Sequence, residues 1–117
     1  MAVFSQGDVV KVPFPYTDRA TRQSRPALVV STEAIEDAHG LLWVLMITSS
    51  GNRGWPGDVA IANLATAGLP VPSVIRTAKI ATIEAVHATR LGRITATLRG
   101  RVLARVLAHV DATLGRP

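Results

Sequence analysis

The seven-residue run LLWVLMI, Leu41–Ile47, constrains the fold more than any other stretch because every residue in it is apolar. Its residues favour β structure, and polar and apolar positions do not alternate, which is the pattern of a strand buried on both faces. The run is also far shorter than the roughly 20 residues that a membrane-crossing helix needs. We therefore predict a central strand over residues 41–48, with Trp43 in the core.

Shorter strand patterns lie on both sides of this run. The segments predicted as strands are 7–14, 27–31, 58–62 and 73–86, the last as one strand or two. Pro13 and Pro15 are expected to end the first strand, since proline donates no backbone hydrogen bond. The polar residues 15–25 and 49–57 predict exposed loops, and residues 31–40 a short helical turn.

The periodicity changes to that of a helix after Thr95. Apolar residues then recur at every fourth position, at Leu98, Val102, Val106, Val110 and Leu114. Thr95 is the expected N-cap, and Gly115 and Pro117 are expected to end the helix. Gly100 inside it costs about 1 kcal/mol relative to alanine, which suggests a close approach of another segment. These patterns predict a single, mainly β domain, residues 1–117, built as a small antiparallel barrel or twisted sheet with a C-terminal helix.

Composition places the chain among ordinary globular proteins. Hydrophobic residues make up 48% and charged residues 18%, a composition that excludes disorder. There is no cysteine, so disulfides, thiolate catalysis and cysteine-type zinc sites are excluded as well. The N-terminus has no signal-peptide pattern, and we expect a soluble cytoplasmic protein without a membrane partner. The net charge of +5 is uneven, because residues 76–117 carry eight Lys/Arg and two Asp/Glu. A basic half indicates nucleic acid or an acidic protein as partner, although arginines on a terminal helix can simply solvate its outer face.

The sequence excludes several common chemistries. It has no phosphate-binding loop and no dinucleotide fingerprint, its three histidines lie far apart, and its carboxylates are too sparse for a two-metal nuclease. We therefore expect neither metal nor cofactor. What remains is a set of arginines and hydroxyls: Arg19, Arg22, Arg25, Thr48, Ser49, Ser50, Ser73 and Arg76. Arginine suits phosphate because its planar fork donates two parallel hydrogen bonds and keeps its charge. Taken singly, Arg25 could instead form an ion pair at a sheet edge, and Thr48 could simply be a good strand residue.

The order of the motifs is more informative than any one of them. From Gly7 onward the chain contains GDVVKVPFPYTD, RPALVVS, ITSSGN, PSVIRTAKIATIE and LGRI, followed by the terminal helix. In this order and spacing the motifs resemble the MazF/PemK (Kid) family of toxins. The resemblance implies a small SH3-like β-barrel with a C-terminal helix, acting as a homodimer. It also implies a metal-independent endoribonuclease that cuts single-stranded RNA, often mRNA, and that a cognate antitoxin neutralises with an acidic, partly disordered segment.

The resemblance also assigns roles to individual residues. The family's arginine before a proline matches Arg25, and its threonine at the end of the central strand matches Thr48, so these two are expected to be catalytic. The arginine of the later strand matches Arg76. Two features depart from the Kid branch of the family: Ala78 stands where that branch has an acid, and the first loop, RATRQSR, has no histidine. A mechanism that uses either group cannot operate here.

In the expected reaction, the 2′-hydroxyl of the RNA attacks the adjacent phosphorus and leaves a 2′,3′-cyclic phosphate and a 5′-hydroxyl. Arg25 is expected to stabilise the negative charge and to be able to protonate the leaving group, with Arg76 or Lys79 as supporting cations. Thr48 and Ser49 would orient the phosphate or the 2′-hydroxyl. No general base is assigned, because arginine keeps its proton at ordinary pH. The residues expected to bind RNA are Arg19, Arg22, Ser49, Ser50, Arg53, Trp55, Ser73, Arg76 and Lys79.

Alternatives stay open for the function and for Trp55. The chain could be a non-catalytic nucleic-acid-binding barrel that holds phosphates with its basic half. It could also be a CcdB-like toxin, which shares this fold and poisons DNA gyrase by protein contact. Trp55 could stack on an RNA base or anchor its loop on the barrel.

Overall fold

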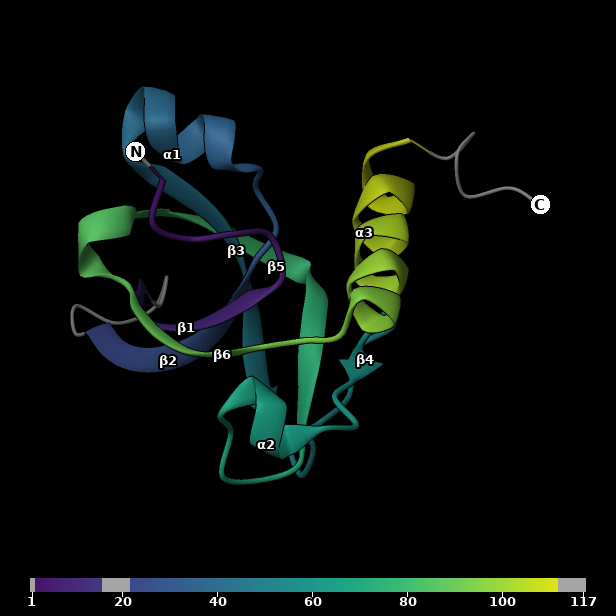
Figure 1. Cartoon of the computed structure of the whole chain (residues 1–117). Coiled ribbons are helices and arrows are strands. Elements are labelled where there is room, and N and C mark those ends of the chain that lie inside the picture. The colour runs from purple at the N-terminus through teal and green to yellow at the C-terminus, as the bar shows by residue number, and fades with distance from the viewer. Residues whose placement is uncertain (1, 16–21, 112–117) are drawn as a thin grey trace.

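The computed structural model describes residues 2–15 and 22–111 of the chain. A curled, antiparallel, six-stranded sheet forms most of the molecule, and the C-terminal helix α3 (Ala96–Val110) packs against it (Figure 1). From one edge to the other, the strands are β4 (Val59–Ala60), β5 (Ser73–Glu84), β3 (Leu41–Ser49), β2 (Arg22–Val29), β1 (Asp8–Pro15) and β6 (Thr89–Arg93). The protein is thus mainly β with a C-terminal helix, as the sequence predicts.

The apolar run forms β3, which pairs with β2 on one side and with β5 on the other. This confirms the predicted central strand. The prediction for Trp43 is wrong, because its side chain is 46% exposed. Leu45 and Ile47 share the face of Trp43, since alternate strand residues point to the same side, and both belong to the core under α3. Trp43 lies nearer the start of the strand, where the helix no longer covers that face.

Two apolar cores lie on opposite sides of the sheet. The first lies between the sheet and α3 and includes Val9, Leu28, Leu45, Ile47, Ile75 and Val102. The second includes Phe4, Val10, Val12, Val29, Val44 and Met46. Successive residues of β1 and β3 alternate between these cores, as the two-residue period of a strand requires. This arrangement explains why β3 lacks a polar face.

The terminal helix begins where the sequence predicts. The Thr95 side chain accepts a hydrogen bond of 3.2 Å from the Leu98 N–H and so caps α3. The helix ends at Val110, earlier than expected, and Gly115 and Pro117 lie outside the described residues. The suggestion of a close approach at Gly100 is wrong, because no atom of another segment lies within 4 Å of the position that a Cβ would take there.

The prolines of β1 do not end the strand, contrary to expectation. β1 continues through Pro13 to Pro15, which pairs with Arg22 at the start of β2. β6 pairs with β1 only as far as Lys11. Beyond that point β1 has one neighbour among the described strands, so the missing N–H groups of the prolines need not break a ladder.

The remaining elements are short. The predicted helical turn is α1 (Glu33–His39), which ends at Gly40 in the left-handed conformation with φ of 67°. Of the strand predicted over 58–62, only the two residues of β4 pair as a strand. The segment after it contains α2 (Leu64–Ala67). Residues 73–86 form the single strand β5 and then the 3₁₀ turn η1 (Ala85–His87). The sequence analysis missed β6, whose residues show no strand alternation.

Candidate functional site

A hollow of about 370 Å³ opens beside the end of β3, and β1, β2, β6 and the segment 68–73 complete its wall. Four predicted site residues line it: Arg25, Thr48, Ser49 and Ser73. Lys11 of β1 lines it as well. The sequence analysis placed Lys11 on a strand but gave it no role. We call this feature the Arg25–Thr48 hollow.

The pairing of β2 with β3 explains why Arg25 and Thr48 meet. Ala27 pairs with Met46 in this antiparallel ladder. Arg25 lies two residues before Ala27 and Thr48 two residues after Met46, so each shares the face of its strand with that paired residue. The pairing of the two strands therefore places Arg25 of β2 and Thr48 of β3 on the same face of the sheet.

The hollow is positively charged and only partly polar. Lys11 and Arg25 are cations, and none of the described residues that line the hollow is a carboxylate. Arg25 is half-buried and Thr48 is only 5% exposed, while Leu69 and Val71 contribute apolar surface. A concave site with apolar walls strengthens the field of its cations, so an anionic ligand fits it.

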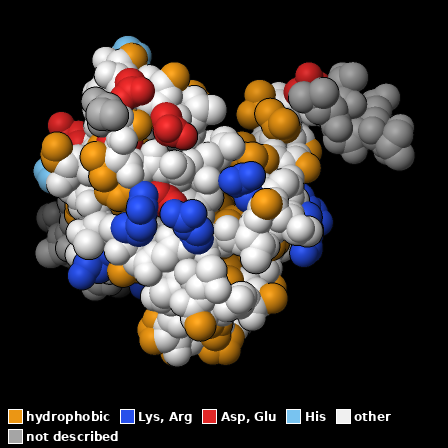
Figure 2. Space-filling view, viewed as in Figure 1, with side chains coloured by type: hydrophobic (Ala, Val, Ile, Leu, Met, Phe, Trp, Pro, Cys, Tyr) orange, Lys and Arg blue, Asp and Glu red, His pale blue; other side chains and the backbone are white. Residues whose placement is uncertain are grey.

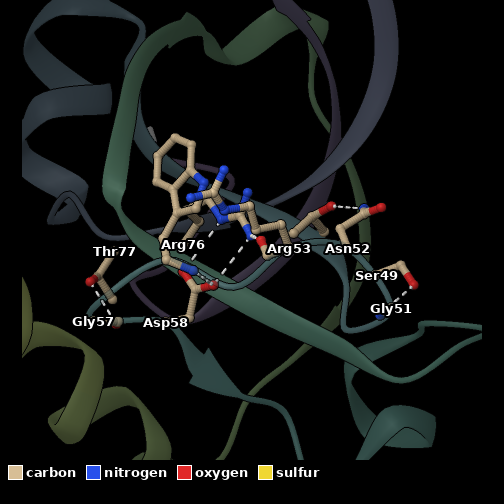
Figure 3. A network of polar contacts seen from close by, with 10 residues as sticks. Ser49, Gly51, Asn52, Arg53, Gly57, Asp58, Arg76 and Thr77 are labelled. Atoms are coloured by element: carbon tan, nitrogen blue, oxygen red, sulfur yellow. Dashed lines mark hydrogen bonds and ion pairs between the residues drawn. The ribbon is translucent and has the colours of Figure 1, made fainter.

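A tight turn follows β3 and fixes the hydroxyls at its end. Asn52 Nδ2 donates a hydrogen bond of 2.7 Å to Thr48 Oγ1, and Ser49 Oγ accepts one of 3.3 Å from the Gly51 N–H. The Ser50 hydroxyl donates to the Pro72 carbonyl at 3.2 Å. Figure 3 shows Ser49, Gly51 and Asn52 at one end of this polar network. Asn52 has no role in the sequence analysis, although it belongs to the quoted ITSSGN motif.

Arg76 does not line the hollow. Its side chain instead holds the loop that follows β3. Its guanidinium forms an ion pair of 3.2 Å with Asp58, donates a hydrogen bond of 2.7 Å to the Arg53 carbonyl and stacks on the Trp55 ring at 4.4 Å (Figure 3). The residue is 8% exposed. Trp55 is 41% exposed, so one face of its ring rests on Arg76 while much of the residue remains in contact with solvent.

A second contact ties this loop to α3. Thr77 Oγ1 donates a hydrogen bond of 2.8 Å to the Gly57 carbonyl and lies 3.0 Å from Nε2 of His109. Through this contact His109 links α3 to β5.

The other predicted RNA-binding residues are dispersed. Arg53 is exposed on the loop after β3, and Lys79 is half-buried on β5; neither lines the hollow. Ser73 donates its hydroxyl proton to the Val71 carbonyl at 2.8 Å. Arg19 lies outside the described residues, and of Arg22 only the backbone, at the start of β2, is described.

Exposed arginines gather on β6 and α3. They are Arg90, Arg93, Arg99, Arg101 and Arg105. In Figure 2 the basic side chains occupy the middle of this face, and acidic side chains lie above them, over α1. Asp8 neutralises Arg90 at 2.7 Å. The uneven charge of the sequence thus becomes a separate basic surface on β6 and α3.

Two kinds of feature are absent from the described residues. Within residues 2–15 and 22–111, no group of three or more histidines and carboxylates could hold a metal ion. In the same ranges no helix is both long and apolar enough to span a membrane.

The curled sheet, the terminal helix and the hollow lined by cations together define a small half-barrel protein. A family model described as "PemK-like, MazF-like toxin of type II toxin-antitoxin system" matches residues 5–114. The chain therefore belongs to this toxin family. No curated protein matches it.

Solved structures with this fold include several toxins of the same family. MazF from Deinococcus radiodurans superposes with a TM-score of 0.76 at 23% identity, covering 94% of this chain and 98% of that one. A MazE–MazF structure from the same organism gives 0.71 at 24%, covering 95% and 98%. A mycobacterial endoribonuclease in complex with its cognate antitoxin gives 0.69 at 20%, covering 100% and 98%. At these identities the likeness establishes the fold.

Proposed function

We propose that this chain is an endoribonuclease toxin that cleaves single-stranded RNA, including mRNA, without a metal ion. The observation that carries the proposal is the Arg25–Thr48 hollow, which Arg25, Thr48 and Lys11 line and which has no carboxylate among its described lining residues. Such a site suits a phosphodiester. Membership of the toxin family supports the same function, and one solved protein with this fold is called an endoribonuclease.

In the proposed reaction, the 2′-oxygen of the RNA forms a bond to phosphorus as the bond to the 5′-oxygen breaks. The 2′-hydroxyl loses its proton, the 5′-oxygen gains one, and the products are a 2′,3′-cyclic phosphate and a 5′-hydroxyl. Negative charge grows on the phosphoryl oxygens in between, and fixed cations in a partly dry site stabilise it. We assign this task to Arg25, with leaving-group protonation as its second role, and leave the general base unassigned.

Arg76 and Lys79 stay the supporting cations in this proposal. Arg76 pairs with Met46 of β3 and so lies on the face of the sheet that Thr48 shares, while its guanidinium also holds Asp58, the Arg53 carbonyl and Trp55. Thr48 supplies a hydroxyl to the phosphate. The predicted RNA contacts at Arg19, Arg22, Ser49, Ser50, Arg53, Trp55 and Ser73 also stay part of the proposal.

The test is the cleavage of a long single-stranded RNA by the purified protein with EDTA present. We expect Arg25→Ala to lower the rate at saturating RNA by on the order of 100-fold or more, the usual cost of losing one principal charge-stabilising donor. Arg105→Ala, an exposed arginine outside the hollow, is the matched control and should keep the wild-type rate. Mapping of the fragment ends should find cyclic phosphates and 5′-hydroxyls. An Arg25→Ala variant that cuts normally would refute the assignment.

The same assay separates the two alternatives. A non-catalytic RNA binder would retard RNA on a gel, with strong salt dependence, and leave it intact. A gyrase-poisoning toxin would arrest growth without cutting RNA, and Arg25→Ala would not relieve that arrest. The concentration of hydroxyls beside Arg25 favours phosphodiester chemistry over both.

We extend the proposal to the partners. A cognate antitoxin with an acidic, partly disordered segment would meet a positive hollow and the arginines of β6 and α3. Support comes from a related fold solved as a MazE–MazF structure and another solved with its cognate antitoxin. A homodimer and a location in the cytoplasm, where mRNA is found, complete the proposal.

A further inference from the structure

The Thr48 hydroxyl has a partner with no assigned role. Asn52 Nδ2 donates to Thr48 Oγ1 across 2.7 Å, a short distance for an N–H···O bond. Thr48 is 5% exposed, whereas Asn52 lies in the exposed turn after β3. A solvent-facing amide thus reaches back to a nearly buried hydroxyl that belongs to the wall of the hollow.

The contact with Asn52 determines which hydrogen bonds the Thr48 hydroxyl can still form. A threonine hydroxyl has one proton to donate and two lone pairs that accept. The amide of Asn52 occupies one lone pair and directs the hydroxyl proton away from itself. No described residue accepts a hydrogen bond from Thr48 Oγ1, and no described carboxylate lines the hollow. The proton is therefore available to an anionic oxygen of a ligand.

The turn holds Asn52 from both sides. Before it, the Ser50 N–H and hydroxyl both donate to the Pro72 carbonyl, at 3.0 and 3.2 Å. After it, the Arg53 carbonyl accepts a hydrogen bond of 2.7 Å from Arg76. The Asn52 N–H itself donates to the Ser49 carbonyl at 3.1 Å. A side chain anchored at each flank can fix the orientation of its target, which is what a supporting residue of a reactive site must do.

We propose that Asn52 is a positioning residue that makes Thr48 a hydrogen-bond donor to a phosphoryl oxygen at the scissile phosphate. The inference rests on the proposed endoribonuclease function. No covalent bond changes at either residue: Asn52 donates to Thr48, and Thr48 donates to the phosphate as its negative charge grows. Thr48 then acts as a stabiliser of charge and not as the acceptor of the 2′-hydroxyl proton.

The experiment compares two substitutions of Asn52 in single-turnover cleavage at saturating RNA. Asn52→Ala removes the donor, and we expect a three- to tenfold fall in rate, equivalent to one ordinary hydrogen bond. Asn52→Asp keeps the shape but offers only acceptors, so it captures the Thr48 proton and adds negative charge. We expect this variant to be slower than Asn52→Ala and at least about tenfold slower than the wild type.

A double-mutant cycle with Thr48→Val gives a readout that a merely structural role would not produce. If Asn52 acts through the Thr48 hydroxyl, Asn52→Ala should slow the Thr48→Val enzyme by less than about twofold. Thr48→Ser, which retains a hydroxyl, should restore sensitivity to Asn52→Ala and serves if Thr48→Val does not fold. Asn63→Ala is the matched control, because Asn63 accepts from the Thr66 N–H and lies on a different loop. It should lower the melting temperature without changing the cleavage rate.

Each possible result supports or contradicts the positioning role of Asn52. Asn52→Ala within twofold of the wild-type rate overturns the inference and leaves the proposed function intact. Equal slowing with and without the Thr48 hydroxyl also overturns it, since Asn52 would then act independently of Thr48. An Asn52→Asp variant as fast as the wild type would mean that Asn52 serves as an acceptor and would refute the donor role. If the wild type cuts no RNA, the proposed function fails first and the inference falls with it.

Discussion

Arg25 and Arg76 are arginines on strands of the same sheet, yet the fold uses them differently. Arg25 lines the hollow with Thr48, whereas Arg76 is surrounded by Asp58, the Arg53 carbonyl and the Trp55 ring. The side chains of Arg76 and Asp58 are 9% and 12% exposed. An ion pair so deeply buried is worth little against an apolar pair, but breaking it leaves a charge without its partner. Arg76 therefore matters first to the loop that it holds.

We predict that Arg76→Ala lowers the free energy of unfolding by about 3 kcal/mol, because it removes the cationic partner of the Asp58 carboxylate, whose side chain is only 12% exposed. Urea denaturation measures this, and Arg93→Ala, at an exposed arginine, should change the value by less than about 0.5 kcal/mol. Adding Asp58→Ala to Arg76→Ala should cost little more, since the pair is already broken. A stable Arg76→Ala protein that has lost RNA affinity would instead make Arg76 an RNA contact.

At the same scale, the sequence could name part of the candidate site. Arg25 and Thr48 were assigned through the resemblance of RPALVVS and ITSSGN to a family; both line one hollow, and their catalytic roles stay predictions. Asn52 could not be assigned in this way, because its role depends on the direction in which a side chain turns within a tight turn. Asp58 and Arg76 are 18 residues apart in sequence, and nothing in the local patterns pairs them.

At the level of elements, the best predictions concern strands and helices whose own residues carry a clear apolar pattern. β3 is a continuous apolar run and α3 has a helical periodicity, and both were placed from sequence. β6 was missed because nearly all its residues are exposed, so it lacks an apolar signal and depends on backbone pairing with β1. β1 likewise runs through two prolines, because β6 pairs with it only as far as Lys11. The length of that pairing depends on the sheet and cannot be inferred from the residues of β1 alone.

Replacing either of two glycines with alanine tests how tightly its surroundings are packed. A Cβ at Gly92 would meet main-chain atoms of Thr66 and Ala67 in α2, whereas one at Gly100 meets no atom of another segment within 4 Å. We expect Gly92→Ala to destabilise the protein by about 2 kcal/mol or more through overpacking. Gly100→Ala should stabilise it by about 0.5–1 kcal/mol through helix propensity. Thermal unfolding measures both, and shifts of the same sign would contradict this account of α2 and β6.

Over the whole molecule, charge is divided between a small working site and a larger surface. The net charge is +5, and five exposed arginines lie on β6 and α3, separate from the hollow. Fields of this kind act at a distance and raise the rate at which a polyanion arrives, while added salt screens them over about 10 Å at 0.1 M. The arginines of α3 should therefore affect encounter and not chemistry.

The prediction is made with Arg99, Arg101 and Arg105 all changed to glutamine. At low salt and subsaturating RNA, we expect this variant to cut several-fold more slowly than the wild type, because association is less well steered. At saturating RNA the rates should agree, and at high salt the difference should vanish. A deficit that persists at saturation would place these residues in the chemical step.

The stacking of Trp55 on Arg76 has an optical consequence. The chain contains two tryptophans, and the second, Trp43, lies on the far half of β3 from the turn that carries Asn52. Replacing Trp43 with phenylalanine leaves a single tryptophan, whose ring centroid lies 4.4 Å from a guanidinium carbon. Any movement that opens this loop separates the indole from that cation and changes its surroundings. The loop thus contains its own fluorophore, and its rearrangements can be timed by stopped flow without an attached dye.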